Sequence, residues 1–181
     1  MLRVAAFCVY LAAWVILAIA AVVGAIPRLQ RVAAGATRIT VPDLVGMLLQ
    51  GCAAVATTLL MNPGPLRPGT LALAGTLVLS PMAAGLFVWA LRSAPEKAEA
   101  LATGGAYAWL RHPIYTAFLA MLIATGLLVS GGLKLIPAVG LYLAGCELRI
   151  ASEEMDLDER FPGSYAQYRL RTRWRYLPGL R

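Results

Sequence analysis

Residues 114–150 read IYTAFLAMLIATGLLVSGGLKLIPAVGLYLAGCELRI, and this stretch decides the fold. It holds two apolar runs, residues 114–133 and 135–150, which meet at the short segment SGGLK (130–134). The hydrocarbon core of a membrane is about 30 Å thick and takes about 20 residues of α-helix. A segment as short as SGGLK permits only a tight turn between two helices. The stretch therefore predicts two transmembrane helices that form a helical hairpin.

Three more apolar runs precede the hairpin, at residues 4–26, 44–61 and 70–91. The chain of 181 residues is 60% hydrophobic and 14% charged, and its mean hydropathy is +0.71. Soluble domains carry about 25% charged residues, so this much apolar surface needs lipid as its solvent. The first run exceeds the roughly 7–15 apolar residues of a secretory signal, and we expect it to be retained. We predict an all-α integral membrane protein, a single domain (1–181) with five transmembrane helices and a helical C-terminal tail.

Basic residues are divided unevenly between the two sides that five spans create. Most of the 16 lysines and arginines fall in the loops after the first and third runs and in the C-terminal tail. By the positive-inside rule, this places the tail in the cytoplasm and the N-terminus outside. We therefore expect a multi-pass protein of a bacterial cytoplasmic membrane, with its site on the cytoplasmic face. In such a protein the net charge of +7 indicates contact with anionic membrane lipids rather than nucleic acid.

Charged residues lie at both cytoplasmic ends of the predicted hairpin. Arg111 and His112, the only histidine of the chain, directly precede the fourth run at Pro113. Glu147 and Arg149 lie in the last turns of the fifth run, where charge is costly unless it faces protein or water. One interpretation makes these residues anchors at the level of the lipid headgroups. We favour the other, a water-filled cavity that holds a binding site, because the fifth run is short and its inner end is charged.

Three strings around this cluster resemble a known family. They are GAYAWLRHPIYTAF (105–118), RIASEE (149–154) and RFPGSYAQYRLRTRWRYLPGL (160–180). In this order they resemble the isoprenylcysteine carboxyl methyltransferase and phospholipid methyltransferase superfamily, and the resemblance covers residues 105–179. The sequence departs from the family pattern at Ala106, Ala117 and Pro162, where the family prefers Pro, Gly and Gly. None of these departures removes a charged residue.

The resemblance implies a membrane methyltransferase that uses S-adenosylmethionine. It assigns catalytic roles to Arg111, His112, Glu153 and Glu154. It assigns cofactor binding to Gly105, Tyr107, Arg111, His112, Pro113, Tyr115, Glu153, Glu154, Tyr165 and Tyr168. These residue types suit the cofactor, because carboxylates pair with its amino group, a guanidinium pairs with its carboxylate, and aromatic faces stabilise its sulfonium.

The resemblance also implies a lipidic or prenylated small molecule as methyl acceptor, above all the carboxylate of an isoprenylcysteine. A carboxylate needs no general base, whereas an amine or thiol would have to lose its proton to Glu147, Glu153, Glu154 or His112. The alternatives are a phospholipid N-methyltransferase, a sterol-type reductase that uses NADPH, and a lipid-binding protein without enzymatic activity. The reductases usually carry Asn after the Pro and Arg-Asp-Glu at the paired acids, and this chain has neither. The cysteines and the single histidine lack metal-ligand spacing, so we expect no metal site.

Overall fold

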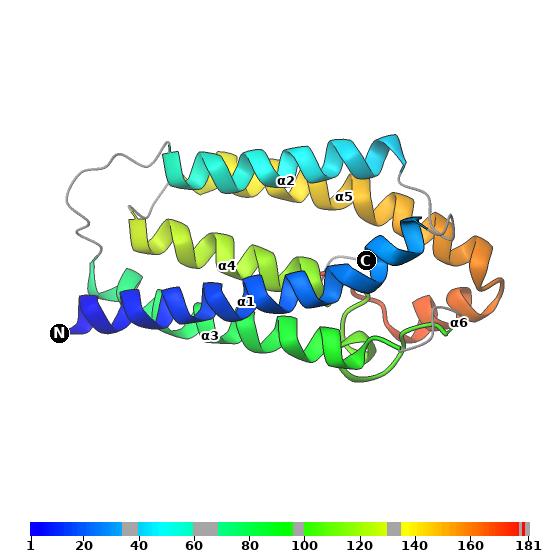
Figure 1. Ribbon diagram of the computed structural model, residues 1–181, viewed down its shortest axis with the longest axis horizontal. Coiled ribbons are helices and arrows are strands. Elements are labelled where there is room, and N and C mark those ends of the chain that lie inside the picture. Colours follow the sequence, from blue (N-terminus) through cyan, green and yellow to red (C-terminus); the bar gives the residue numbers. More distant parts are fainter. Residues whose placement is uncertain (34–39, 60–68, 96–99, 130–134, 178, 180–181) are drawn as a thin grey trace.

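The computed structural model describes residues 1–33, 40–59, 69–95, 100–129, 135–177 and 179, and all regular elements in these ranges are helical (Figure 1). The elements are α1 (Leu2–Ala33), α2 (Val41–Leu59), α3 (Thr70–Ser93), the short 3₁₀ helix η1 (Gly105–Ala108), α4 (Pro113–Val129), α5 (Leu135–Arg160) and α6 (Ser164–Arg171). The predicted all-α architecture is confirmed, including a helical tail.

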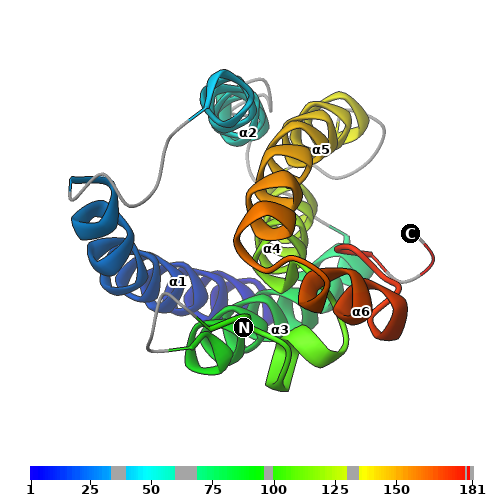
Figure 2. The same ribbon diagram turned by 90° about the vertical axis from the view of Figure 1, so that its right-hand side faces the viewer.

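The helices α1 to α5 lie side by side, and consecutive helices run in opposite directions (Figure 1). α3 packs against α1 and α4, while α2 packs mainly against α5. Seen along the long axis, the helices follow the order α1, α3, α4, α5, α2, so that α1 and α2 stand apart at the two ends of the series (Figure 2). α4 and α5 are antiparallel, as the hairpin prediction requires. The predicted turn at residues 130–134 lies outside the described residues.

The outer surface of the bundle is apolar. Within the described ranges, three helical segments are long and apolar enough to cross a membrane, namely Leu2–Val23, Thr70–Ser93 and Leu135–Arg160. α2 and α4 are apolar but shorter. Large side chains such as Leu11, Val15 and Ile19 on α1 are exposed. Because a soluble monomer rarely exposes so extended an apolar surface, the structure is that of a multi-pass membrane protein.

α5 is longer than the fifth run predicted from the sequence, which ended at residue 150. The helix continues to Arg160, so Glu153 and Glu154 lie inside it and not in a tail behind it. Ion pairs one turn apart support this extension, with Arg149 Nη2 3.4 Å from Glu153 Oε1 and Arg160 Nη1 3.2 Å from Asp156 Oδ2. The prediction was too short because apolar content alone set the limit, whereas paired charges continue a helix beyond the membrane.

The other helix ends also differ from the predicted runs. α1 extends to Ala33, beyond the predicted end at residue 26, whereas the predicted end of the fourth run at residue 133 lies outside the described residues. α2 starts at Val41 and not at residue 44, because Thr40 and Asp43 form a capping box. The backbone N–H of Asp43 donates to Thr40 Oγ1 (3.3 Å), and the N–H of Thr40 donates to Asp43 Oδ2 (3.0 Å).

The start of α2 is attached to α5 by hydrogen bonds and by close helix packing. Ser152 on α5 donates to Asp43 Oδ2 (3.2 Å), so the capping box lies next to Glu153. Further along, α2 and α5 approach each other at two glycines. A Cβ atom on Gly145 would lie only 2.7 Å from the carbonyl oxygen of Gly46. Small residues at this crossing therefore permit the contact between the two helices.

The charged parts of the chain gather at one end of the bundle, opposite the N-terminus (Figure 1). They comprise the start of α4, the second half of α5 and α6. After α6 the chain returns to the start of α4, where the N–H of Arg111 donates to the carbonyl of Trp174 (3.0 Å) and the N–H of His112 to that of Arg175 (2.8 Å). We call residues 172–177 the C-terminal strap.

Candidate active site

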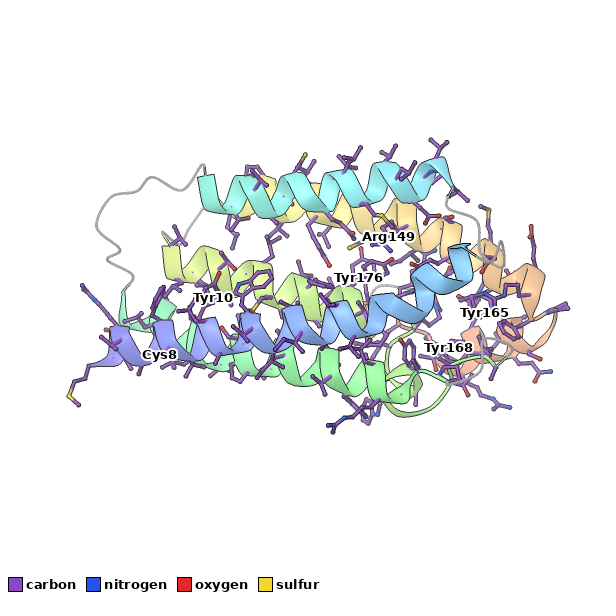
Figure 3. The ribbon with its side chains drawn as sticks, viewed as in Figure 1. Cys8, Tyr10, Arg149, Tyr165, Tyr168 and Tyr176 are labelled. Carbon is purple, nitrogen blue, oxygen red and sulfur yellow. The ribbon has the colours of Figure 1, made fainter. Side chains whose placement is uncertain are left out.

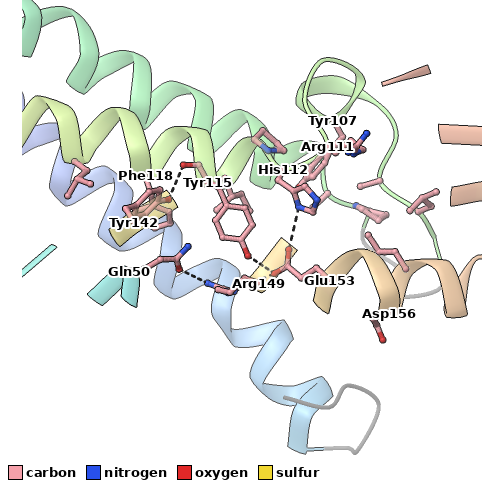
Figure 4. Close-up of a pocket in the computed structure, with 18 of the residues that line it drawn as sticks. Gln50, Tyr107, Arg111, His112, Tyr115, Phe118, Tyr142, Arg149, Glu153 and Asp156 are labelled. Atoms are coloured by element: carbon pink, nitrogen blue, oxygen red, sulfur yellow. Dashed lines mark hydrogen bonds and ion pairs between the residues drawn. The ribbon is translucent and has the colours of Figure 1, made fainter. Parts of the chain in front are cut away.

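A cavity of about 880 Å³ extends from the charged end of the bundle into the space between the helices (Figure 4). Along α4 its lining changes from His112 and Tyr115 to Phe118 and Leu122. α5 contributes Arg149 and Glu153 to the charged end, while α1 and α2 add mostly small and apolar side chains to the other end. The cavity thus joins a charged end to an apolar arm, as expected from the charged inner end of the fifth run.

Glu153 lies at the centre of the charged end. Tyr115 donates its hydroxyl to Glu153 Oε1 (2.7 Å), and Arg149 Nη2 lies 3.4 Å from the same oxygen. His112 Nδ1 lies 3.4 Å from Glu153 Oε2 (Figure 4). About a quarter of the Glu153 side chain is exposed, 25%, so the carboxylate remains within reach of a molecule in the cavity.

Arg149 lines the cavity beside Glu153, although the site prediction did not include it. Its Nη1 donates to Gln50 Oε1 (3.1 Å), and its guanidinium carbon lies 5.2 Å from the centre of the Tyr115 ring. Its spacing of four residues from Glu153 is a sequence signal for an ion pair on one helix face. No sequence signal pointed to Gln50, because it comes from α2 and reaches Arg149 through the close α2–α5 crossing.

Arg111 and Glu154 form a buried ion pair behind the charged end. Arg111 Nε donates to Glu154 Oε1 (3.0 Å), and the two residues are only 9% and 8% exposed. Arg111 Nη1 also donates to the carbonyl oxygens of Thr172 (3.1 Å) and Arg173 (3.3 Å) in the strap. Arg175 Nη2 donates to the second oxygen of Glu154 (3.0 Å). Arg111 lines the cavity, whereas Glu154 is not among the described residues that line it.

The C-terminal strap also forms an ion pair and a hydrogen bond with Glu147 on α5. Arg175 Nη1 donates to Glu147 Oε2 (2.9 Å), and the Tyr176 hydroxyl donates to Glu147 Oε1 (2.7 Å). The Thr116 hydroxyl donates to the carbonyl of Tyr176. Glu147 therefore contacts the strap and not the cavity, which corrects the expectation that it lines the wet end of α5. The reason is helix geometry, because positions 147 and 149 are two residues apart and point to nearly opposite sides of α5, and Arg149 is the one that lines the cavity.

The tyrosines predicted to bind the cofactor close the charged end. Tyr107, Tyr165 and Tyr168 all line the cavity, and the Tyr168 hydroxyl donates to the carbonyl of Tyr107 (2.7 Å). Pro113 also belongs to the lining, since it starts α4 beside His112. Gly105 is not among the described residues that line the cavity. Its φ of +57° favours glycine, and a Cβ atom at this position would clash with the side chain of Ser93.

His112 lies between the two paired acids. Its Nδ1 is 3.4 Å from Glu153 and its Nε2 is 3.5 Å from Glu154 Oε1. Burial alone lowers the pKa of His112, but the two carboxylates overcome this effect, so that its pKa is raised above the usual value. The two carboxylates therefore favour the protonated, cationic form of the ring at the edge of the cavity.

We expect an NMR titration to give a pKa for His112 above about 6.5, the value of a histidine in an unfolded chain. The chain has one histidine, so its ring signals need no separation from others. Because the folded-state pKa is raised, the stabilisation is fully present below about pH 6.5 and is lost as the pH rises through the folded-state pKa. His112→Asn should remove this part of the pH dependence of thermal unfolding. A measured pKa at or below that of an unfolded histidine would contradict the ion pairing.

The segment that builds most of this site matches a known family. The model of the isoprenylcysteine carboxyl methyltransferase (ICMT) family matches residues 70–159, which include α3, α4 and nearly all of α5. Arg111, His112, Glu153 and Glu154 all lie within the match. Over residues 70–159, just under half of its length, the chain is similar to the ICMT family. An ICMT-family segment implies methyltransferase activity with S-adenosylmethionine as the methyl donor.

The ICMT-family match ends before α6, so it does not include Tyr165, Tyr168 or the strap. No curated protein and no solved structure matches the chain.

Proposed function

We propose that this protein transfers a methyl group from S-adenosylmethionine to the carboxylate of an isoprenylcysteine-like lipid. One observation carries the proposal, namely that a single cavity joins a charged end to an apolar arm between the helices. A charged cofactor and a lipidic acceptor need these two environments side by side. The volume of about 880 Å³ lies within the range of small-molecule sites, roughly 300–1,000 Å³.

The charged end offers partners for each charged group of S-adenosylmethionine. Glu153 suits its ammonium group, His112 as an imidazolium suits its carboxylate, and the faces of Tyr107 and Tyr168 suit its sulfonium. When bound, the cofactor supplies an already activated methyl group. The tasks of the protein are then to align the acceptor and to exclude water.

We assign Arg111 and Glu154 to positioning rather than to direct contact with the cofactor. The Nε and Nη1 atoms of Arg111 already donate to Glu154 and to the strap, and both Glu154 oxygens accept hydrogen bonds from arginines. This pair holds the start of α4 against α5, and thereby sets the distance between His112 and Glu153. For Glu154 we therefore propose a role in supporting Glu153, in place of the cofactor contact predicted from the sequence.

Arg149 is the best partner for an acceptor carboxylate. Its guanidinium lies over Tyr115, where the lining turns apolar. Its Nε atom is buried and has no hydrogen-bond partner among the described residues, which leaves a donor for a bound anion. An ionised carboxylate held there is already nucleophilic, so methyl transfer to it requires no general base.

We further propose that the lipid chain enters sideways between α1 and α2. These helices stand apart in the bundle (Figure 2), and Trp14 on α1 and Val55 on α2 both line the apolar arm. In this proposal α1 to α5 all cross the membrane, so that the chain reaches the arm directly from the lipid.

We predict that the charged end faces the cytoplasm and the N-terminus the outside, because most basic residues lie at the charged end. A reporter that is active only in the cytoplasm should give a signal when fused behind the C-terminus and none when fused before the N-terminus. The reverse pattern would contradict this orientation.

The proposed function can be tested with purified protein in detergent micelles. We expect S-adenosylmethionine with a labelled methyl group to label N-acetyl-S-farnesylcysteine, and alkali to release the label, because a methyl ester hydrolyses. Alkali-stable label in phosphatidylethanolamine would instead indicate a phospholipid N-methyltransferase. Binding of NADPH without binding of S-adenosylhomocysteine would indicate a reductase, and binding of neither would indicate a lipid-binding protein.

A further inference from the structure

The apolar arm of the cavity ends at a set of hydroxyl groups. Tyr10 on α1, Thr57 on α2 and Thr125 on α4 all line this end. The Tyr10 hydroxyl lies 3.0 Å from Thr125 Oγ1, and this hydrogen bond joins residues that are 115 positions apart in the sequence. Figure 3 shows Tyr10 far along the bundle from Arg149, Tyr165 and Tyr168. The arm is therefore polar at the end that lies furthest from the charged site.

The direction of these hydrogen bonds follows from the protons available. Thr125 donates its only hydroxyl proton to the carbonyl of Met121 (2.8 Å), so Tyr10 must donate to Thr125. Thr57 donates to the carbonyl of Ala53 (2.7 Å). All three protons are used, and the Tyr10 side chain also packs against buried residues of α1, α3 and α4. The Tyr10–Thr125 pair is thus a fixed cross-link between α1 and α4.

A hydrocarbon chain gains nothing by passing this pair. To pass, it would have to displace the Tyr10 ring and leave a buried hydroxyl without its partner, which is unfavourable. Before the pair, the chain contacts Trp14, Phe118 and Leu122, and each buried carbon contributes to binding. The favourable length of the chain is therefore the length of the arm.

The length of the arm follows from α4, which lines it throughout. Tyr115 marks the charged end and Thr125 the far end, and ten residues of α-helix span about 15 Å. A zigzag chain with bonds of about 1.5 Å covers this distance with about a dozen carbons. The main chain of a farnesyl group has about this many carbons, whereas a geranylgeranyl group is longer by one isoprene unit.

We propose that Tyr10 and Thr125 determine the chain length of the lipid acceptor, and that they select a farnesyl-sized group over a geranylgeranyl-sized one. The inference rests on the proposed function, because it concerns the acceptor of that reaction. Tyr10 and Thr125 act as specificity-determining residues at the end of the arm, far from the reacting atoms.

The test compares N-acetyl-S-farnesylcysteine with N-acetyl-S-geranylgeranylcysteine, in binding and in methyl transfer. We expect the parent protein to favour the farnesyl compound by roughly tenfold, the discrimination that an apolar pocket commonly achieves. Tyr10→Ala, which opens the end of the arm, should bring the two compounds to within about threefold of each other. Trp89→Ala is the control, because Trp89 is an exposed aromatic residue of α3 outside this cavity, and it should keep the parent preference.

Two milder variants keep the test decisive if Tyr10→Ala does not fold. Tyr10→Phe removes only the hydroxyl, and Thr125→Val removes its partner, so each should weaken the preference while the ring of residue 10 stays in place. Equal use of both compounds by the parent protein would overturn the length selection alone, since the chain would then leave the arm sideways. If no prenylcysteine of either length binds, the proposed function fails and the length selection fails with it.

Discussion

Replacing Arg111 by leucine is expected to lower the free energy of unfolding by about 3 kcal/mol, a typical loss when one partner of a buried ion pair is removed. The change leaves the buried carboxylate of Glu154 with Arg175 as its remaining arginine. It also leaves the carbonyls of Thr172 and Arg173 without the donor from Arg111. The strap then loses part of its attachment to the start of α4. Denaturant titration in detergent micelles, without cofactor, measures the loss.

The matched control is Arg169→Leu. Arg169 Nη1 lies 3.3 Å from Asp158 Oδ2, but both side chains are about half exposed, 47% and 48%. An exposed pair contributes at most about 1 kcal/mol, so this variant should unfold nearly like the parent protein. Similar losses for the two variants would show that Arg111 is an ordinary surface anchor. The assignment of Arg111 and Glu154 as a buried ion pair that holds the strap would then be wrong.

The second large effect is expected from Glu153→Gln, which keeps the size of the side chain and removes its charge. If Glu153 binds the cofactor ammonium, the loss of a hydrogen bond to a charged group, about 1.5–3 kcal/mol, should weaken binding of S-adenosylhomocysteine by roughly 10- to 150-fold. Isothermal titration with the purified protein measures this affinity. Stability should change less than in Arg111→Leu, because the Glu153 side chain is 25% exposed.

Glu159→Gln provides the control for this variant. Glu159 lies on the same helix and is exposed, so the same exchange there should leave the affinity unchanged. Parent-like binding by Glu153→Gln would mean that this carboxylate serves only its contacts with His112, Arg149 and Tyr115. The cofactor site would then have to be placed elsewhere in the cavity.

The Arg111 and Glu153 variants test different roles for two adjacent acids that look equivalent in the sequence. Arg111→Leu removes the buried partner of Glu154, and Glu153→Gln changes the acid that faces the cavity. Successive residues of an α-helix point about 100° apart, so Glu153 and Glu154 face different neighbours. Glu153 reaches the cavity, whereas Glu154 reaches Arg111 and Arg175 behind it. A loss of affinity is therefore expected at the first position and a loss of stability at the second.

The sequence by itself determined the all-α class, the approximate helices and the residues around which the site is built. Apolar runs and the spacing of charged residues are local properties, because a helix needs only its own backbone hydrogen bonds and lipid around it. The strings around Arg111 and Glu153 also indicated the family, since they preserve residue types at fixed spacing. The extension of α5 to Arg160 was missed, because the limit was set by apolar content.

Only the tertiary structure decided which of these residues face the cavity. Arg149 meets Gln50 because α2 and α5 cross at two glycines, and Tyr10 meets Thr125 because α1 and α4 lie on the same face of α3. Glu147 meets Arg175 and Tyr176 because the strap returns from beyond α6 along α5. Each contact joins side chains from separate helices, and its geometry depends on how those helices pack. Periodicity along the chain carries no information about that packing, so these contacts were beyond the reach of the sequence.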